Sequence, residues 1–169
     1  MARYAEKLHI VPLLNSAGST TAAVLSYAAA LENTQWLSFL VTFGAMTSDS
    51  TDVVNVKVVA TDTLGNTTDA QDIGLPFYYR LSGAPGANAD VWGDITAATA
   101  AAGLDITAVQ DNMNLLIDVD PASVPSLHST AKGVRVVLDG TGSVAAVAST
   151  VTGLIESRYP QNAHIPAST

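Results

Sequence analysis

The stretch Trp36–Gly44, which reads Trp-Leu-Ser-Phe-Leu-Val-Thr-Phe-Gly, most strongly constrains what this chain can fold into. Its residues favour β-strands. Because successive side chains of a strand point to opposite faces, the stretch carries apolar groups on both faces. The centre of such a strand is expected to be buried on two sides. Similar runs recur along the chain between Gly, Asn, Asp and Pro residues, which mark turns. The pattern predicts a compact all-β domain.

The spacing of these runs predicts about eight to ten strands, as in an antiparallel β-sandwich or a jelly-roll-like barrel. The segments expected to form strands are Leu8–Leu14, Thr21–Leu31, Trp36–Gly44, Val53–Ala60, Leu75–Ser82, Val91–Ile95, Leu104–Val109, Asn114–Val119, Gly133–Asp139 and Ser143–Glu156. Pro12 lacks an amide donor, which places the first segment at a sheet edge or in an arm. In the fourth segment Val54, Val56 and Val58 share one face, which indicates a half-exposed antiparallel strand.

The segment Thr21–Leu31 can be interpreted in two ways. Its alanines favour a helix, whereas Val24 and Tyr27 favour a strand. We choose the strand, paired with the Trp36 strand through a turn at Glu32-Asn33-Thr34. The helix stays open as the alternative.

The clearest local signal is the pair Asp120-Pro121, because Asp is a good N-cap and Pro suits the first helical position. It predicts one short helix, limited to about two turns by Pro125 and Gly133. Gly153 is expected to introduce a bulge into the last strand.

The 169 residues fit a single β domain. We expect residues 1–20 to form an N-terminal strand or arm, residues 21–156 the sandwich core, and residues 157–169 an extended C-terminal arm. The last segment contains two prolines and no hydrophobic period.

The composition excludes several classes of function. Only 13% of residues are charged, the net charge is −8, and the seven Lys and Arg residues are scattered. Nucleic-acid binding is therefore not expected. There is no cysteine, and no apolar run approaches the roughly 20 residues of a membrane span. The start of the chain lacks the apolar region of a signal peptide, so we expect a protein made in the cytoplasm. The low charge fits either a polar uncharged surface or a surface packed against other subunits.

The residues that could act in catalysis or bind a metal ion do not match a known catalytic or metal-site pattern. The three histidines, His9, His128 and His164, lack metal-site spacing. The carboxylates Asp118 and Asp120 share a strand face and leave a hydrolase open as an alternative. The sequence contains no nucleophile elbow and no phosphate loop, so no cofactor is expected. A second group of carboxylates keeps a calcium site open: Asp49, Asp52, Asp62, Asp69 and Asp72.

Five aromatic residues could line a sugar-binding face of the sandwich: Trp36, Phe77, Tyr78, Tyr79 and Trp92. Trp36 lies in the most apolar strand and is expected in the core. Trp92 follows a Gly/Pro/Asn loop and has acidic neighbours, so it is the better candidate for an exposed contact.

Five segments resemble the small virion proteins that tailed bacteriophages encode in their head-gene region. They are Arg3–Lys7, Trp36–Gly44, Leu115–Asp120, Gly133–Leu138 and Glu156–Pro160. The resemblance spans most of the chain and implies a β-rich, oligomeric, non-enzymatic protein of the capsid decoration or cement type. It transfers no set of functional residues.

The hypothesis is therefore a virion structural protein, located on the capsid surface and assembled in the host cytoplasm. Its expected partners are its own copies, as a dimer or trimer, and the major capsid protein, with no nucleic acid and no membrane. The terminal arms could order on a neighbouring subunit. The candidate interface residues are Arg3, Tyr4, Trp92, Arg158, Tyr159, Pro160 and Ile165. The alternative is a tail-, fibre- or neck-associated binding module that recognises glycans.

Overall fold

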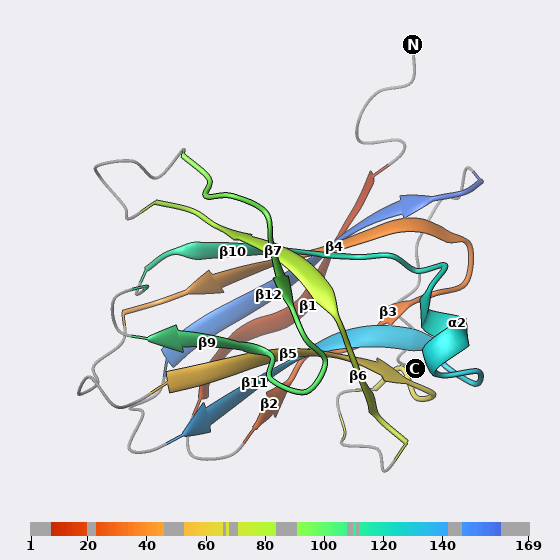
Figure 1. The fold of residues 1–169 in the computed structure, drawn as a ribbon, viewed down its shortest axis with the longest axis horizontal. Coiled ribbons are helices and arrows are strands. Elements are labelled where there is room, and N and C mark those ends of the chain that lie inside the picture. The colour runs from red at the N-terminus through yellow and green to blue at the C-terminus, as the bar shows by residue number, and fades with distance from the viewer. Residues whose placement is uncertain are drawn as a thin grey trace.

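The computed structural model describes residues 8–19, 23–45, 53–65, 67, 71–83, 91–107, 110, 112–141 and 147–159. Two six-stranded sheets, called here sheet A and sheet B, pack face to face (Figure 1). The all-β sandwich predicted from the sequence is confirmed, as is the presence of a short helix.

Sheet A contains, in spatial order, β1 (Leu8–Ser19), β12 (Val147–Ser157), β4 (Thr34–Phe43), β10 (Asn114–Val119), β7 (Phe77–Leu81) and β8 (Thr96–Ala98). Sheet B contains β2 (Val24–Leu25), β3 (Ala29–Ala30), β11 (Gly133–Thr141), β5 (Val53–Thr61), β6 (Ile73–Leu75) and β9 (Leu104–Thr107). All pairings between these strands are antiparallel. β1 lies at the edge of sheet A, where Pro12 was expected to place it.

The core lies between the inner faces of the two sheets. Along β5 the alternation predicted for Val54, Val56 and Val58 is confirmed, because all three are buried while Asn55 and Lys57 are partly exposed. The strands β4, β10 and β11 contribute in the same way through the buried residues Leu37, Phe39, Val41, Phe43, Leu115, Ile117, Val119, Val134, Val136 and Leu138. This pattern of one buried face per strand is what holds a sandwich together.

The predicted hairpin between Thr21–Leu31 and the Trp36 strand is wrong. The segment does form strands, but they are the short β2 and β3, and both pair with β11 in sheet B. A tight turn is present, with Asn33 at φ 58° and the Thr34 amide donating to the Leu31 carbonyl at 3.1 Å. This turn carries the chain from sheet B to sheet A instead of joining two neighbouring strands.

The helix begins later than predicted. α2 spans Val124–Leu127 with Ser123 at its N-cap, and Pro125 lies within its first turn. The Asp120 side chain accepts a hydrogen bond from the Ala122 amide at 2.9 Å, so it stabilises the turn that precedes the helix. Asp120 is therefore a turn residue and not the helix cap.

Two smaller predictions also need correction. The register of β12 is continuous at Gly153, and the irregularities lie in its partner β1, next to Leu14. Gly153 makes room for the core, because a Cβ there would lie 2.9 Å from Leu13 Cδ1. The segment Val91–Ile95 forms only an isolated bridge between Ser82 and Trp92.

Gly103 occupies a backbone conformation that other residues rarely adopt, with φ +66°, and an added Cβ would lie 2.6 Å from the Val56 carbonyl oxygen. We expect Gly103→Ala to lower the free energy of unfolding by about 1–3 kcal/mol, because it adds backbone strain and a contact with a strand. Gly65→Ala is the control, since its Cβ would meet nothing nearer than 3.9 Å. Urea unfolding of both variants checks this; equal stability would contradict it.

Candidate docking face and aromatic pocket

Sheet A presents an outer face whose composition follows from the register of β4. Leu37, Phe39 and Val41 point into the core, so Trp36, Ser38, Leu40 and Thr42 point outward. Ser38 is buried and Leu40 is half-buried, whereas Trp36 is 49% exposed. The burial on both sides that the sequence predicts for the centre of this strand is therefore confirmed by the buried neighbours Ser38 and Phe39.

One row of outward-facing residues crosses all the strands of sheet A. Cross-strand pairing places Ile10, Leu154, Ser38, Asp118, Tyr78 and Ala97 side by side, from β1 to β8. Strands lie about 4.8 Å apart, so the row is about 24 Å long. Its β1 end is apolar, since Ile10 is 66% exposed beside the half-buried Leu154.

The neighbouring row adds Leu40 and Leu116, which lie opposite each other on β4 and β10 and are both half-buried. Together with Ile10 and Leu154 they form an apolar patch, called here the outer stripe. It crosses β1, β12, β4 and β10. Ile10 is exposed and the three leucines are half-buried, so the outer stripe is a candidate surface for binding another protein.

The outer face of sheet B differs because its own chain covers part of it. Arg135 lies on this face of β11 and is fully buried, with its Nη1 donating to the carbonyl oxygens of Gly65 at 3.2 Å and Thr67 at 2.6 Å. Its Nη2 forms an ion pair with Asp72. Gly65, Thr67 and Asp72 are thus held over the outer face of sheet B by Arg135.

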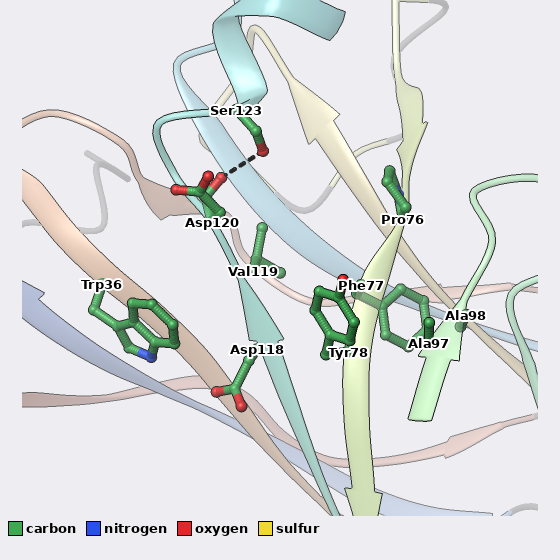
Figure 2. A pocket seen from close by; sticks show the side chains of 10 residues that line it. All are labelled: Trp36, Pro76, Phe77, Tyr78, Ala97, Ala98, Asp118, Val119, Asp120 and Ser123. Carbon is green, nitrogen blue, oxygen red and sulfur yellow. Dashed lines mark hydrogen bonds between the residues drawn. The ribbon is translucent and has the colours of Figure 1, made fainter. Parts of the chain in front are cut away.

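A pocket of about 350 Å³ lies on the outer face of sheet A next to β10 (Figure 2). The rings of Trp36 and Tyr78 stand on either side of the strand that carries Asp118, and the turn with Asp120 and Ser123 lies beyond Asp118. Both rings are accessible, with Trp36 49% and Tyr78 59% exposed. The remaining lining residues are Pro76, Phe77, Ala97, Ala98 and Val119.

Hydrogen bonds fix two of the pocket's side chains. The Trp36 indole Nε1 donates to the Ser38 hydroxyl at 3.0 Å, and that hydroxyl donates to Asp118 Oδ1 at 2.5 Å. The chain Trp36–Ser38–Asp118 therefore orients an aromatic ring and a carboxylate toward the same space. Such a pair can stack on a flat or ring-shaped group and accept its hydrogen bonds.

The prediction that Trp36 lies in the core is wrong. Apolar residues occupy both faces of its strand, so the sequence did not determine which face points inward. Trp92, expected as the exposed aromatic contact, is 36% exposed and lies away from the pocket lining. Tyr78, one of the aromatic residues considered for a sugar-binding face, lies opposite Asp118 in the β7–β10 pairing and lines the pocket.

The other predicted interface residues fall into two groups. Arg158 and Tyr159 follow β12 and are exposed, with the Arg158 amide donating to the Asn33 carbonyl at 3.0 Å. The remaining members lie outside the described residues, as do the ends of both predicted arms: Arg3, Tyr4, Pro160 and Ile165.

Both carboxylates of the predicted pair, Asp118 and Asp120, line the pocket. Of the carboxylates considered for calcium, Asp72 pairs with Arg135, and Asp49, Asp52 and Asp69 lie outside the described residues. Within the described ranges no group of three or more His, Asp or Glu side chains is placed to hold a metal ion. In the same ranges no helix is long and apolar enough to cross a membrane.

Comparison of the chain with protein-family models, with curated proteins and with solved structures gave no match.

Proposed function

We propose that this chain is a non-enzymatic structural protein of a tailed-phage virion, of the capsid decoration or cement type. The observation that carries the proposal is the outer stripe on sheet A, in which Ile10 is exposed and three leucines are half-buried. The other outer face of the sandwich is partly covered by its own chain. The resemblance of the five strand and arm segments supplies the assignment to a virion. The partners are other copies of the chain, as a dimer or trimer, and the major capsid protein.

The physical role of such a protein is to bind neighbouring shell subunits through buried area. Removing apolar surface from water stabilises a contact by roughly 25 cal/mol per Å², and Ile10, at the edge of the stripe, has much exposed surface to bury. The low content of charged side chains, 13%, keeps the desolvation cost of such a contact small. In this proposal the chain lies at the capsid surface and binds neither nucleic acid nor membrane.

The absence of an enzymatic role is also a proposal, supported by the state of the two pocket carboxylates. Asp118 already accepts a hydrogen bond from Ser38, and Asp120 accepts one from the Ala122 amide. The described residues that line the pocket include no histidine, lysine or arginine to act with them as an acid or base.

Two matched isoleucine substitutions test the proposal. Ile10→Asp is expected to weaken binding to capsids of the phage that encodes the chain at least tenfold, because it places a charge on the outer stripe. Ile73→Asp changes an isoleucine of sheet B that is 41% exposed and should bind as the wild type does. Co-sedimentation with capsids measures both, and thermal unfolding verifies that both variants fold. Equal binding by the two variants would contradict the proposed docking face.

The alternative is a tail-, fibre- or neck-associated module that recognises glycans. The observation in its favour is the exposed pair Trp36 and Tyr78 beside two carboxylates, since aromatic rings stack on sugars and carboxylates accept hydroxyl hydrogen bonds. It predicts that the purified chain binds oligosaccharides on a glycan array and does not sediment with capsids.

A further inference from the structure

The pocket between Trp36 and Tyr78 has an unbalanced charge. Asp118 and Asp120 both line it, and the described lining residues include no cationic side chain. The whole chain carries a net charge of −8, which adds to the negative potential at this site. A ligand that covers the pocket must remove water from these carboxylates, and a positive charge on the ligand offsets that cost.

The aromatic walls favour the same kind of ligand. The open faces of Trp and Tyr rings attract cations through their electron density. Trp36 on β4 and Tyr78 on β7 lie on strands that β10 separates, so the two strands are about 10 Å apart. The two rings stand on either side of the strand that carries Asp118, and a flat group can lie between or against them (Figure 2).

Asp118 can accept a further hydrogen bond from a ligand. Ser38 occupies Oδ1 at 2.5 Å, and within the described residues no hydrogen bond involves Oδ2. A carboxylate that lines the pocket, with one oxygen held by its neighbour, suits the planar donor fork of a guanidinium. A lysine ammonium would match the charge, but it would not stack on the rings as a flat guanidinium does.

We propose that this pocket receives an arginine side chain from the protein on which sheet A docks. The inference rests on the proposed function, because it names the chemistry by which the partner is recognised. The apolar outer stripe then supplies contact area, and the pocket at the other end of the same cross-strand row sets which partner surface fits.

N-acetyl-arginine amide is the probe, and N-acetyl-citrulline amide, which has nearly the same shape and no charge, is its control. The readout is the NMR signal of the Trp36 indole N–H in the folded chain with Trp92→Phe. The arginine probe should shift this signal saturably at millimolar concentration, and the citrulline control should bind at least tenfold more weakly. Asp118→Asn keeps the Ser38 hydrogen bond and should bind the arginine probe at least tenfold more weakly than the wild type. Asp139→Asn on sheet B should bind the probe as tightly as the wild type.

A citrulline response equal to that of arginine would overturn the inference. So would a stronger response to a neutral oligosaccharide such as chitohexaose, which would favour glycan recognition. If Asp118→Asn does not fold, Tyr78→Ala replaces it, because that side chain is 59% exposed and its loss should leave the fold intact.

Capsid binding separates this inference from the proposed function. If Asp118→Asn and Tyr78→Ala bind capsids as tightly as the wild type, the arginine site is overturned and the proposed function still stands. A chain that binds the arginine probe but ignores capsids would support the arginine-binding chemistry and contradict the virion role.

Discussion

Replacing Arg135 with methionine is expected to lower the free energy of unfolding by about 3–5 kcal/mol, the usual cost of removing one partner of a buried ion pair. Arg135 is fully buried on the outer face of sheet B and is bound by Asp72 and two backbone carbonyl groups. Its loss removes an ion pair from the Asp72 carboxylate and a buried hydrogen-bond donor from each of the two carbonyl groups. Chemical unfolding in urea measures the effect.

A conservative change should not rescue the site. Arg135→Lys keeps the charge, but one ammonium cannot reach Gly65, Thr67 and Asp72 together in the geometry of a guanidinium. Lys132→Met is the control, because Lys132 is exposed and next to β11, and it should change stability by less than about 0.5 kcal/mol. Equal stability of Arg135→Met and wild type would mean that the segment between β5 and β6 does not depend on this ion pair.

The second large effect is expected from adjacent residues on opposite faces of β4. Phe39→Ala should cost about 3–5 kcal/mol, because it removes a fully buried ring from the core and leaves a cavity. Leu40→Ala should cost about 1 kcal/mol or less, because Leu40 faces outward and is only half-buried.

The same pair also distinguishes stability from binding. Leu40 belongs to the outer stripe, so Leu40→Ala is expected to weaken capsid binding while the protein stays folded. Thermal unfolding of the two variants measures their stability, and co-sedimentation with capsids measures their binding. If Leu40→Ala proved as destabilising as Phe39→Ala, the outer face of sheet A would be buried in the folded chain and could not serve as a docking face.

Strand identity could be predicted where one face of a strand is apolar and the other polar. β5 shows this, because Asn55 and Lys57 among valines determine which face points outward. The Trp36 strand offers no such contrast, so its apolar pattern left the position of Trp36 undetermined. The alanine-rich segment before it failed differently: strands as short as β2 and β3 contain too few residues to specify a partner, and only the assembled sheet B shows that they pair with β11.

The candidate site could not be assembled from the sequence because its parts are distant along the chain. Trp36, Tyr78 and Asp118 come from β4, β7 and β10, and only the strand pairing brings them together. Asp118 and Asp120 could be placed on a common face by their spacing, which the pocket confirms. The sequence did not indicate that Arg135 is buried, since a single arginine in a valine-rich strand usually lies in solvent.

The most direct test of the proposed docking face is hydroxyl-radical footprinting of the chain bound to capsids and free in solution. We expect oxidation of Ile10, Trp36 and Tyr78 to fall on binding, while Ile73 and Leu127, which are exposed elsewhere on the molecule, keep their free-state rates. Unchanged oxidation of the sheet A residues at saturating capsid, or protection of Ile73 and Leu127 alone, would contradict docking through the outer face of sheet A.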